Sequence, residues 1–519
     1  MSIQLLQGNK LELPQVSMTN GSNVPIVKLP IEENGVSSEL RLSEDDFSKH
    51  LLIVGGIGSG KTNTFNYIIS SLSESMTVND VMVIFDTKGE YLKEFYRQGD
   101  IIIANDDSLF PPRYNIDYWN IFEEILIDQK NIKDNVNEIS KTLFYEQTQN
   151  TTNVFFPNAA KDIFFAYILA SARKHIANNT IMVNNRELSS FFNQVDVDML
   201  NELFEIYPDL RSIKNYISNK GQQTQGVLSE VIRLVRDIFT GNFEKVGDLS
   251  IRNAIRKKGN KRIFIEYDLG IGNVLSPIYR LLIDLAIKES LCRDKSAGNV
   301  YFVLDEFRLL PHLQHVDDGI NFGRSQGAKF IIGMQNIQQI NEAYGENIAG
   351  SILSGLSTKF VFRVNDYKTR EYVKNLFGKN RYVEAFYSQD TSKGLVEEIV
   401  EGNVAEDWII NKLPTGVAIY TSVGCDPRII RMFEYGKSLP ITTFNIKRER
   451  THPDIDMSNT IPSEGFNIKQ RNRNILEDEV IIAETRNDRA DVGSFNIRRK
   501  INGNLVSENS PSKDDNIGK

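Results

Sequence analysis

Residues 51–62 have the residue types and the spacing of a phosphate-binding loop. They fit G-x-x-x-x-G-K-[ST], beginning at Gly55 and ending with Gly60, Lys61 and Thr62. In such a loop the backbone N–H groups surround phosphate oxygens, and the start of the following helix adds positive potential. We therefore expect bound ATP, held by Gly55, Gly56, Ile57, Gly58, Ser59, Gly60, Lys61 and Thr62.

The residues on either side of this loop supply the context that the motif requires. Residues 51–54 are apolar and predict a strand, and the pattern after Thr62 predicts a helix to about residue 71. Lys61 is expected to reach the β- and γ-phosphates, and Thr62 to place its hydroxyl on Mg²⁺. A glycine turn that binds nothing is the alternative, and the flanking strand and helix count against it.

Two adjacent acids, Asp305 and Glu306, follow the apolar run at residues 300–304. Such runs are typical of strands buried on both faces of a parallel sheet, whose carboxyl ends carry ligands. Asp305 has the type and position to hold Mg²⁺ through its water shell, and Glu306 to polarise a water for attack on the γ-phosphate. Adjacent acids also occur as plain turn residues, but the upstream loop favours a Walker B motif.

Two further side chains are candidates for sensing or stabilising phosphate charge. Gln335 follows the predicted strand at residues 329–333 and is expected to contact the γ-phosphate; helix capping is the alternative. Arg324 lies on the glycine-flanked turn at residues 323–327, and a planar, always charged guanidinium suits a transition-state phosphate. A neighbouring subunit would supply it. Arg363 competes for this role, and a surface salt bridge is the alternative for both arginines.

The densest basic run is at residues 252–258, with Lys261 and Arg262 close behind. Such a run could follow a DNA backbone through phosphate contacts. More often it is a solvated helix end, which the helix dipole favours. We leave both interpretations open from the sequence.

Strand-like and helical segments alternate over much of the chain. Apolar runs of strand type are at residues 81–86, 101–104, 262–267, 300–305, 329–333, 359–364 and 416–421. This alternation predicts an α/β fold, a RecA-like P-loop motor domain with a mostly parallel central sheet. Between them, residues 112–258 have helical periodicity and predict an all-α insertion domain.

The predicted organisation therefore has a motor domain in two parts. Its segments are a small β-rich N-terminal segment at 1–49, motor parts at 50–111 and 259–445, the insertion at 112–258, and a polar, disordered tail at 446–519. Within the tail, residues 479–483 could form a short strand.

Composition limits the remaining classes. The chain has 519 residues and a formal net charge of −8, so any contact with nucleic acid must come from local basic patches or a pore lining. The two cysteines, Cys292 and Cys425, are far apart and favour neither a disulfide framework nor a zinc site. No stretch reaches the ~18–20 apolar residues of a membrane span. We expect a cytoplasmic protein, with recruitment to the inner face of the membrane by a partner as an option.

Together these motifs resemble the HerA/FtsK superfamily of ring ATPases, and within it the TraD/TraG-type coupling proteins of type IV secretion and conjugation. The resemblance covers about residues 40–435, with the all-α insertion in the family's position. It is carried by residues 55–62, 85–90, 303–307, 323–327 and 333–335. Thr87 stands where the family often has proline.

The resemblance implies a homo-hexameric ring with ATP between subunits and DNA in the central channel. It implies that the ring moves DNA, or a relaxase–DNA complex, into a secretion channel. Thr62 and Asp305 then serve Mg²⁺, Glu306 activates water, and Arg324 acts on a neighbour's nucleotide. Two alternatives stay open: a HerA-like DNA motor working with a nuclease in DNA processing or phage defence, and an ATP-gated adaptor for protein cargo.

Overall fold

The computed structural model describes residues 2–7, 25–33, 35–149, 153–178, 182–217, 221–292, 298–387, 395–436, 497–501 and 504–508. The chain forms two compact units. The larger consists of Gln4–Tyr382 and Ile399–Pro440, and the smaller of Met1–Ile3, Val383–Glu398 and Ile441–Lys519. In the smaller unit β15 (Ile497–Ile501) pairs antiparallel with β16 (Asn504–Glu508). The strand predicted at residues 479–483 and most of the predicted tail lie outside the described residues.

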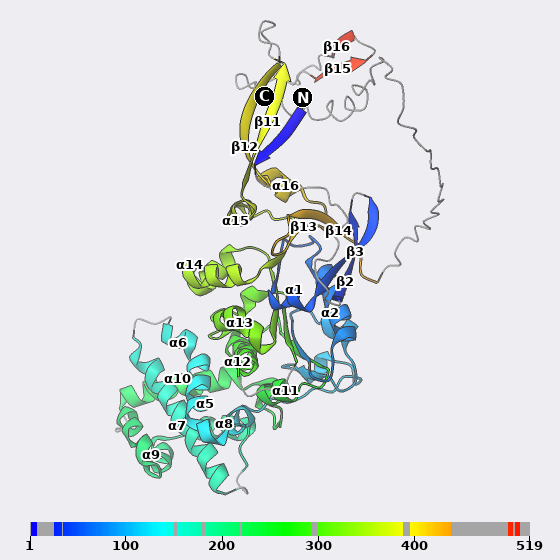
Figure 1. Ribbon diagram of the computed structural model, residues 1–519. Helices are drawn as coiled ribbons and strands as arrows, with labels where there is room; N and C mark the ends of the chain where they lie inside the picture. Colours follow the sequence, from blue (N-terminus) through cyan, green and yellow to red (C-terminus); the bar gives the residue numbers. More distant parts are fainter. Residues whose placement is uncertain are drawn as a thin grey trace, which may run out of the picture. The chain divides into compact units, whose positions relative to one another are not determined.

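An 11-stranded sheet forms the centre of the larger unit (Figure 1). In spatial order its strands are β3 (Val36–Ser43), β2 (Pro25–Glu33), β14 (Arg428–Met432), β13 (Val417–Thr421), β10 (Thr358–Val361), β4 (Leu51–Val54), β9 (Ala328–Met334), β8 (Val300–Leu304), β5 (Val81–Asp86), β7 (Lys261–Glu266) and β6 (Ile101–Ile103).

The strands from β10 to β6 in this order run parallel, as the alternation of strands and helices predicts. Strands β4, β5, β8 and β9 are buried along their whole length. Continuous apolar runs are needed there because both faces of a parallel sheet are covered by helices. All carboxyl ends of these strands lie along one edge of the sheet.

The run predicted at residues 416–421 is a strand, β13, but it pairs antiparallel with β10. β13 also pairs antiparallel with β14. The connection between β13 and β14 is short, and a short connection can join two neighbouring strands only if they are antiparallel. The β2–β3 hairpin continues this antiparallel edge through β14. The sheet is therefore mostly parallel with an antiparallel extension, which the pattern of apolar runs did not predict.

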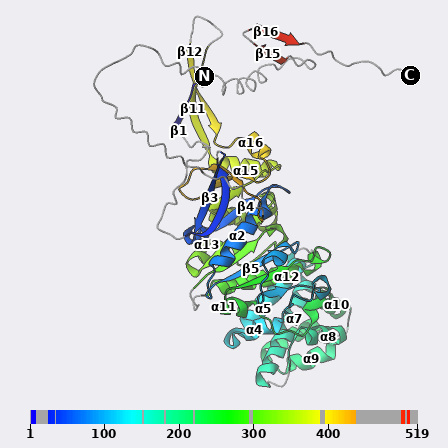
Figure 2. The ribbon, with the colours of Figure 1, turned by 90° about the vertical axis from the view of Figure 1, so that its right-hand side faces the viewer.

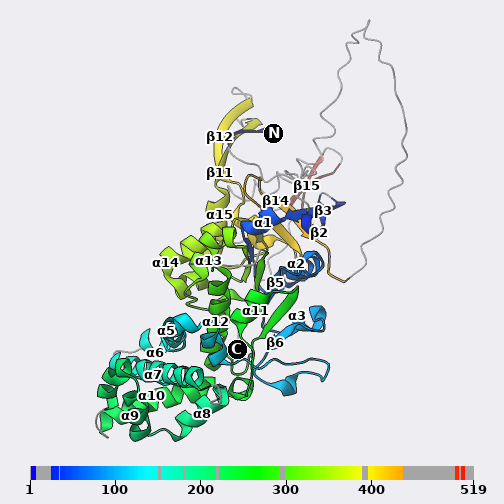
Figure 3. The same ribbon diagram turned by 60° about the horizontal axis from the view of Figure 1, so that its bottom comes forward.

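Helices cover both faces of the sheet (Figures 1 and 3). On one face are α2 (Lys61–Ser75) and α3 (Glu90–Phe95), and on the other α12 (Gly272–Ser290), α13 (Val316–Phe322) and α14 (Gln338–Gly355). Along each strand, alternate side chains enter the two apolar cores. On β4, for example, Leu51 and Ile53 belong to one core, and Leu52 and Val54 to the other. Outside the segment between β6 and β7, the remaining α-helices are α1 (Glu44–Ser48), α15 (Tyr367–Phe377) and α16 (Asp407–Lys412), and the remaining strands are β1 (Ser2–Gln7), β11 (Lys379–Tyr387) and β12 (Leu395–Asn403).

In the chain, a block of helices lies between β6 and β7. Figure 2 shows most of these helices gathered together, from α4 to α11. The block consists of α4 (Ile121–Leu126), α5 (Ile132–Leu143), α6 (Tyr145–Gln149), α7 (Phe155–Ala177), α8 (Asn185–Gln194), α9 (Val197–Glu205), α10 (Gln222–Ile238) and α11 (Ile251–Lys257). The helical periodicity of this region therefore predicts the element type correctly. The division of the chain into domains at residues 112 and 258 stays a prediction.

One apolar core runs without interruption from the sheet into this helical block. The ring of Phe85 on β5 packs edge-on against Tyr279 on α12, with centroids 6.2 Å apart. Tyr279 in turn contacts Phe243 at 6.0 Å, and Phe243 contacts Trp119 at 6.4 Å. The sheet, α12 and the helical block thus share their buried surface.

Among the helices of the described ranges, none combines the length and the apolar character that crossing a membrane requires.

Candidate nucleotide-binding site

The phosphate-binding loop joins β4 to α2 at the carboxyl edge of the sheet. Gly58 and Gly60 have φ values of 67° and 117°, where side chains are strongly disfavoured. A Cβ on Gly55 would lie 2.6 Å from Cβ of Phe362, so the packing of the neighbouring segment requires glycine at position 55. The glycine positions of the motif therefore have a direct structural reason.

The first two glycines of the loop are tied to the strands on either side. The N–H of Gly55 donates to the carbonyl of Met334 at 3.1 Å, and that of Gly56 to the carbonyl of Arg363 at 2.8 Å. The N–H groups of the first turn of α2 have no partner within the helix and point to its amino end. We infer that these later groups, rather than those of Gly55 and Gly56, face a phosphate.

Lys61 begins α2 and lies across the loop. Its ammonium donates to the carbonyls of Gly55 at 2.7 Å and Gly56 at 3.3 Å. Burial lowers the pKa of Lys61, and the nearby carboxylates of Asp305 and Glu306 oppose this shift. The site therefore holds a desolvated cation among acids, and half-buried Thr62 follows it in the same helical turn.

Asp305 directly follows β8 and is 9% exposed. Its Oδ2 accepts a hydrogen bond from the Tyr91 hydroxyl at 2.7 Å. Burial raises the pKa of Asp305, while this hydrogen bond and the charge of Lys61 lower it. The predicted metal-binding acid is thus close to the phosphate-binding lysine, and one of its oxygens is already bonded.

Glu306 and Gln335 are brought together although they follow different strands. Nε2 of Gln335 donates to Oε2 of Glu306 at 2.9 Å. The other oxygen of Glu306 accepts from Nε of Arg308 at 2.7 Å. Strands β8 and β9 are parallel neighbours, so their carboxyl ends place these side chains at the same edge. The geometry supports a shared role for the predicted base and the predicted sensor.

Arg324 lies at the opposite edge of the sheet. It belongs to a 3-10 turn, Gly323–Gln326, that precedes β9. Its side chain is 58% exposed and donates to Oδ1 of Asp45 at 2.9 Å. The structure therefore does not bring Arg324 to the phosphate-binding loop of its own chain.

Arg363, the competing arginine, follows β10 at the carboxyl edge. Its carbonyl accepts the N–H of Gly56, which places its backbone against the phosphate-binding loop. Within the part of the chain that the structure describes, its guanidinium makes no hydrogen bond or ion pair. Arg363 thus lies beside the phosphate-binding loop of its own chain, a position that differs from that of Arg324.

A second loop lies at this edge of the sheet, and none of its residues was among the site residues predicted from the sequence. It follows β5 and leads into α3. The charge of Lys88 in this loop acts on both Lys61 and Asp305, and Tyr91 bonds Asp305 directly. In the sequence, residues 85–90 carry part of the family resemblance. Nothing in the sequence indicates that Tyr91, the next residue, reaches another strand.

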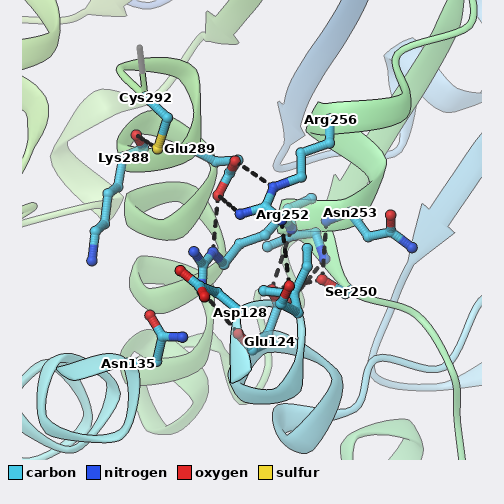
Figure 4. A network of polar contacts seen from close by, with 12 residues as sticks. Glu124, Asp128, Asn135, Ser250, Arg252, Asn253, Arg256, Lys288, Glu289 and Cys292 are labelled. Atoms are coloured by element: carbon cyan, nitrogen blue, oxygen red, sulfur yellow. Dashed lines mark hydrogen bonds and ion pairs between the residues drawn. The ribbon is translucent and has the colours of Figure 1, made fainter. Parts of the chain in front are cut away.

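The basic run has both exposed and buried members (Figure 4). Arg256 and Lys257 are exposed in the last turn of α11, as the interpretation of a solvated helix end predicts. Nε of Arg252 and Nε of Arg256 both bond the carboxylate of Glu289, at 3.0 and 2.7 Å, and the Arg252 side chain is 6% exposed. Arg262 forms a buried pair with Asp100 at 2.8 Å. Arg252 and Arg262 therefore stabilise the interior and cannot contact a DNA phosphate.

Comparison with known proteins agrees with this architecture. Plasmid coupling protein TrwB in complex with ADP and Mg²⁺ superimposes with a TM-score of 0.64 at 19% identity, covering 84% of this chain and 96% of that one. An unbound form of TrwB gives a TM-score of 0.64 over 83% of this chain. The predicted α/β fold is confirmed.

Curated coupling proteins also match in sequence. Coupling protein TraD of Escherichia coli is 21% identical over 372 residues, 68% of this chain and 48% of TraD. Coupling protein VirD4 of Bartonella henselae is 21% identical over 397 residues, 72% of this chain and 60% of VirD4. The chain thus spans about half to three fifths of these relatives. A family model described as the type IV secretion-system coupling protein DNA-binding domain matches residues 37–402. The predicted resemblance is confirmed, and the chain belongs to this family of coupling proteins.

Proposed function

We propose that the protein is an ATP-hydrolysing, ring-forming DNA translocase. In this role it is a coupling protein that delivers DNA, or a relaxase–DNA complex, to a conjugative type IV secretion apparatus. The observation that carries the proposal is the convergence of Lys61, Asp305, Glu306 and Gln335 at one sheet edge, in a chain of the coupling-protein family.

The donor set of this edge fits a magnesium nucleotide. Backbone N–H groups and an ammonium suit phosphate oxygens, and hydroxyl and carboxylate oxygens suit Mg²⁺. We assign Lys61 and the loop to phosphate, and Thr62 and Asp305 to Mg²⁺. When bound, Mg²⁺ neutralises negative charge on the phosphates. Gly55 has no room for a Cβ and Gly60 has little, and without one the phosphates can approach the backbone of the loop closely.

Glu306 is the residue that we assign to the attacking water. Hydrogen bonds from Gln335 and Arg308 to its two oxygens fix the plane of the carboxylate. A carboxylate so held can take a proton from water when one of these bonds opens. Gln335 joins the base to the neighbouring strand, which suits it to register whether a γ-phosphate is present.

The position of Arg324 supports a ring. An exposed guanidinium at the amino edge of the sheet can act only on a nucleotide bound by another subunit. We therefore propose a homo-hexamer in which Arg324 completes the neighbour's site and DNA occupies the central channel. Arg363, beside its own loop, serves the nucleotide of its own subunit.

The same proposal assigns the remaining parts of the chain. The helical block between residues 112 and 258 is an insertion domain of a motor that spans residues 50–111 and 259–445. The protein acts in the cytoplasm, with a relaxase and the secretion channel as partners. Residues 1–49 and 446–519 flank the motor.

The test is the rate of ATP hydrolysis with and without single- and double-stranded DNA, across protein concentration. We expect stimulation by DNA that rises cooperatively with concentration and disappears in Lys61→Ala and Glu306→Gln. Lys93→Ala, which alters a lysine on α3 outside the motif, is the control and should keep the wild-type rate.

Hydrolysis that ignores DNA at every protein concentration would contradict the translocase and favour an adaptor for protein cargo. Hydrolysis that persists in Lys61→Ala would contradict the nucleotide site itself.

A further inference from the structure

The hydroxyl of Tyr91 is the direct link between the loop after β5 and the acid after β8. It lies 2.7 Å from Oδ2 of Asp305, and Tyr91 is 3% exposed. Its ring also packs against Phe65 of α2, with centroids 6.3 Å apart. One buried side chain therefore contacts both the helix that begins at the phosphate-binding loop and the acid assigned to Mg²⁺.

The position of Tyr91 is fixed by a second carboxylate. Oδ1 of Asp86 accepts the N–H groups of Lys88 and Gly89 at 3.0 and 2.9 Å. Its Oδ2 accepts those of Tyr91 and Leu92 at 2.8 and 3.0 Å. Helix α3 has 6 residues, which is too short for a helix to be stable alone. Gly89, at its N-cap, has no side chain that could cap it. Asp86 thus supplies the cap that sets where α3, and with it the Tyr91 ring, begins.

We propose that Tyr91 is a positioning residue for Asp305: its hydroxyl occupies Oδ2 and fixes the carboxylate plane, leaving Oδ1 for the water shell of Mg²⁺. The inference rests on the proposed nucleotide site and adds a residue to it. A carboxylate without this bond could rotate about its χ2 torsion, because such torsions have broad, shallow wells. Fixing the carboxylate in advance removes that freedom before the metal binds.

One substitution can separate the effect of the Tyr91 hydroxyl on metal binding from the effect of the ring on packing. Tyr91→Phe keeps the ring against Phe65 and removes only the hydroxyl. Partners of metal ligands typically change affinity by about 10- to 100-fold when they are mutated. We therefore expect the half-saturating Mg²⁺ concentration to rise by about tenfold in this variant.

The experiment measures binding of a fluorescent ADP analogue to the full chain, with Mg²⁺ titrated and in excess EDTA. Tyr91→Phe should bind as the wild type does in EDTA and need about ten times more Mg²⁺ to gain the metal-dependent affinity. Tyr301→Phe is the matched control. Tyr301 lies on β8, the strand that Asp305 follows, and is also 3% exposed, but its hydroxyl accepts from Nδ2 of Asn299 at 3.4 Å. This control should match the wild type in both conditions.

Three results are decisive. A wild type that gains no affinity from Mg²⁺ would overturn the proposed site together with the role of Tyr91. A Mg²⁺-dependent wild type with an identical Tyr91→Phe titration would overturn the role of Tyr91 alone. Equal weakening of Tyr91→Phe with and without Mg²⁺ would show that the hydroxyl only supports packing, which also contradicts the proposal.

Discussion

Gln335 donates a hydrogen bond to Glu306 across two parallel strands, with Nε2 and Oε2 2.9 Å apart. The residues are neighbours only because β8 and β9 end at the same level of the sheet. In the proposed reaction this contact joins the group that activates water to the group that registers phosphate. The proposed reaction would therefore couple hydrolysis to its detection through this one hydrogen bond.

We predict that Gln335→Ala binds nucleotide normally but hydrolyses ATP about 10- to 100-fold more slowly, since Glu306 loses the partner that orients it. Single-turnover hydrolysis and equilibrium nucleotide binding distinguish the two effects. Gln338→Ala, at a glutamine of α14 that bonds Glu342, should leave both unchanged. A Gln335→Ala variant with wild-type turnover would exclude the coupled role.

We predict that Arg324 acts between subunits and Arg363 within one. Arg324→Ala and Lys61→Ala proteins should each be inactive alone. Mixed together they should regain part of the ATPase activity, because a Lys61→Ala subunit still supplies Arg324 to the intact loop of its neighbour. A mixture of Arg363→Ala with Lys61→Ala should stay inactive, since no site then has both its own loop lysine and its own Arg363. The reverse pattern would exchange the two assignments.

We predict that Arg262→Ala destabilises the chain by about 3 kcal/mol, because it leaves the carboxylate of Asp100 buried without its cation. The two side chains are 3% and 2% exposed. Lys261→Ala, one residue earlier on β7 and exposed, should change stability by less than about 0.5 kcal/mol. Urea unfolding of the two variants makes the comparison, and equal midpoints would show that the buried pair contributes little.

We predict that stability falls in mild acid through His50. In the neutral ring Nε2 donates to the carbonyl of Ile320 at 2.9 Å, and Nδ1 accepts the N–H of Phe330 at 3.1 Å. Burial lowers the pKa of His50 from 6.5 to about 4. Between these values the unfolded chain binds more protons, so stability is fully present above pH 6.5 and is lost as the pH falls toward 4.

The measurement is urea unfolding at about pH 4.5 and about pH 7, which span most of this window, for the wild type and His50→Gln. Glutamine can both donate and accept but does not titrate, so the variant should lose less stability on acidification, by up to about 3 kcal/mol. Equal losses in the two proteins would show that other groups govern the acid response.

The sequence predicts the parts of the site that are local in the chain. Glycine positions, the loop lysine and the acids at a strand end are visible because each depends on residues within one short segment. The confirmed parallel sheet follows from the same kind of pattern, in which apolar runs alternate with amphipathic helices. The assignments of Lys61, Asp305 and Glu306 remain predictions, now supported by their proximity.

Contacts between distant segments could not be predicted in this way. The bond from Tyr91 to Asp305 joins residues 214 positions apart, and neither residue type requires the other. The basic run at residues 252–258 illustrates the same limit. Whether an arginine faces solvent or Glu289 depends on how α11 packs against α12, which composition does not encode. The direction of β13 likewise could not be predicted, because it depends on which strand β13 pairs with.

The uninterrupted apolar core between the sheet and the helical block has a mechanical consequence. Swinging the block away from the sheet would expose shared surface at a cost of roughly 25 cal/mol for every Å². Rings such as Phe85, Tyr279 and Phe243 would lose their contacts together. In the proposed motor, the helical block would therefore move with the sheet as one body, and a conformational change that starts at the nucleotide would reach the far end of the block.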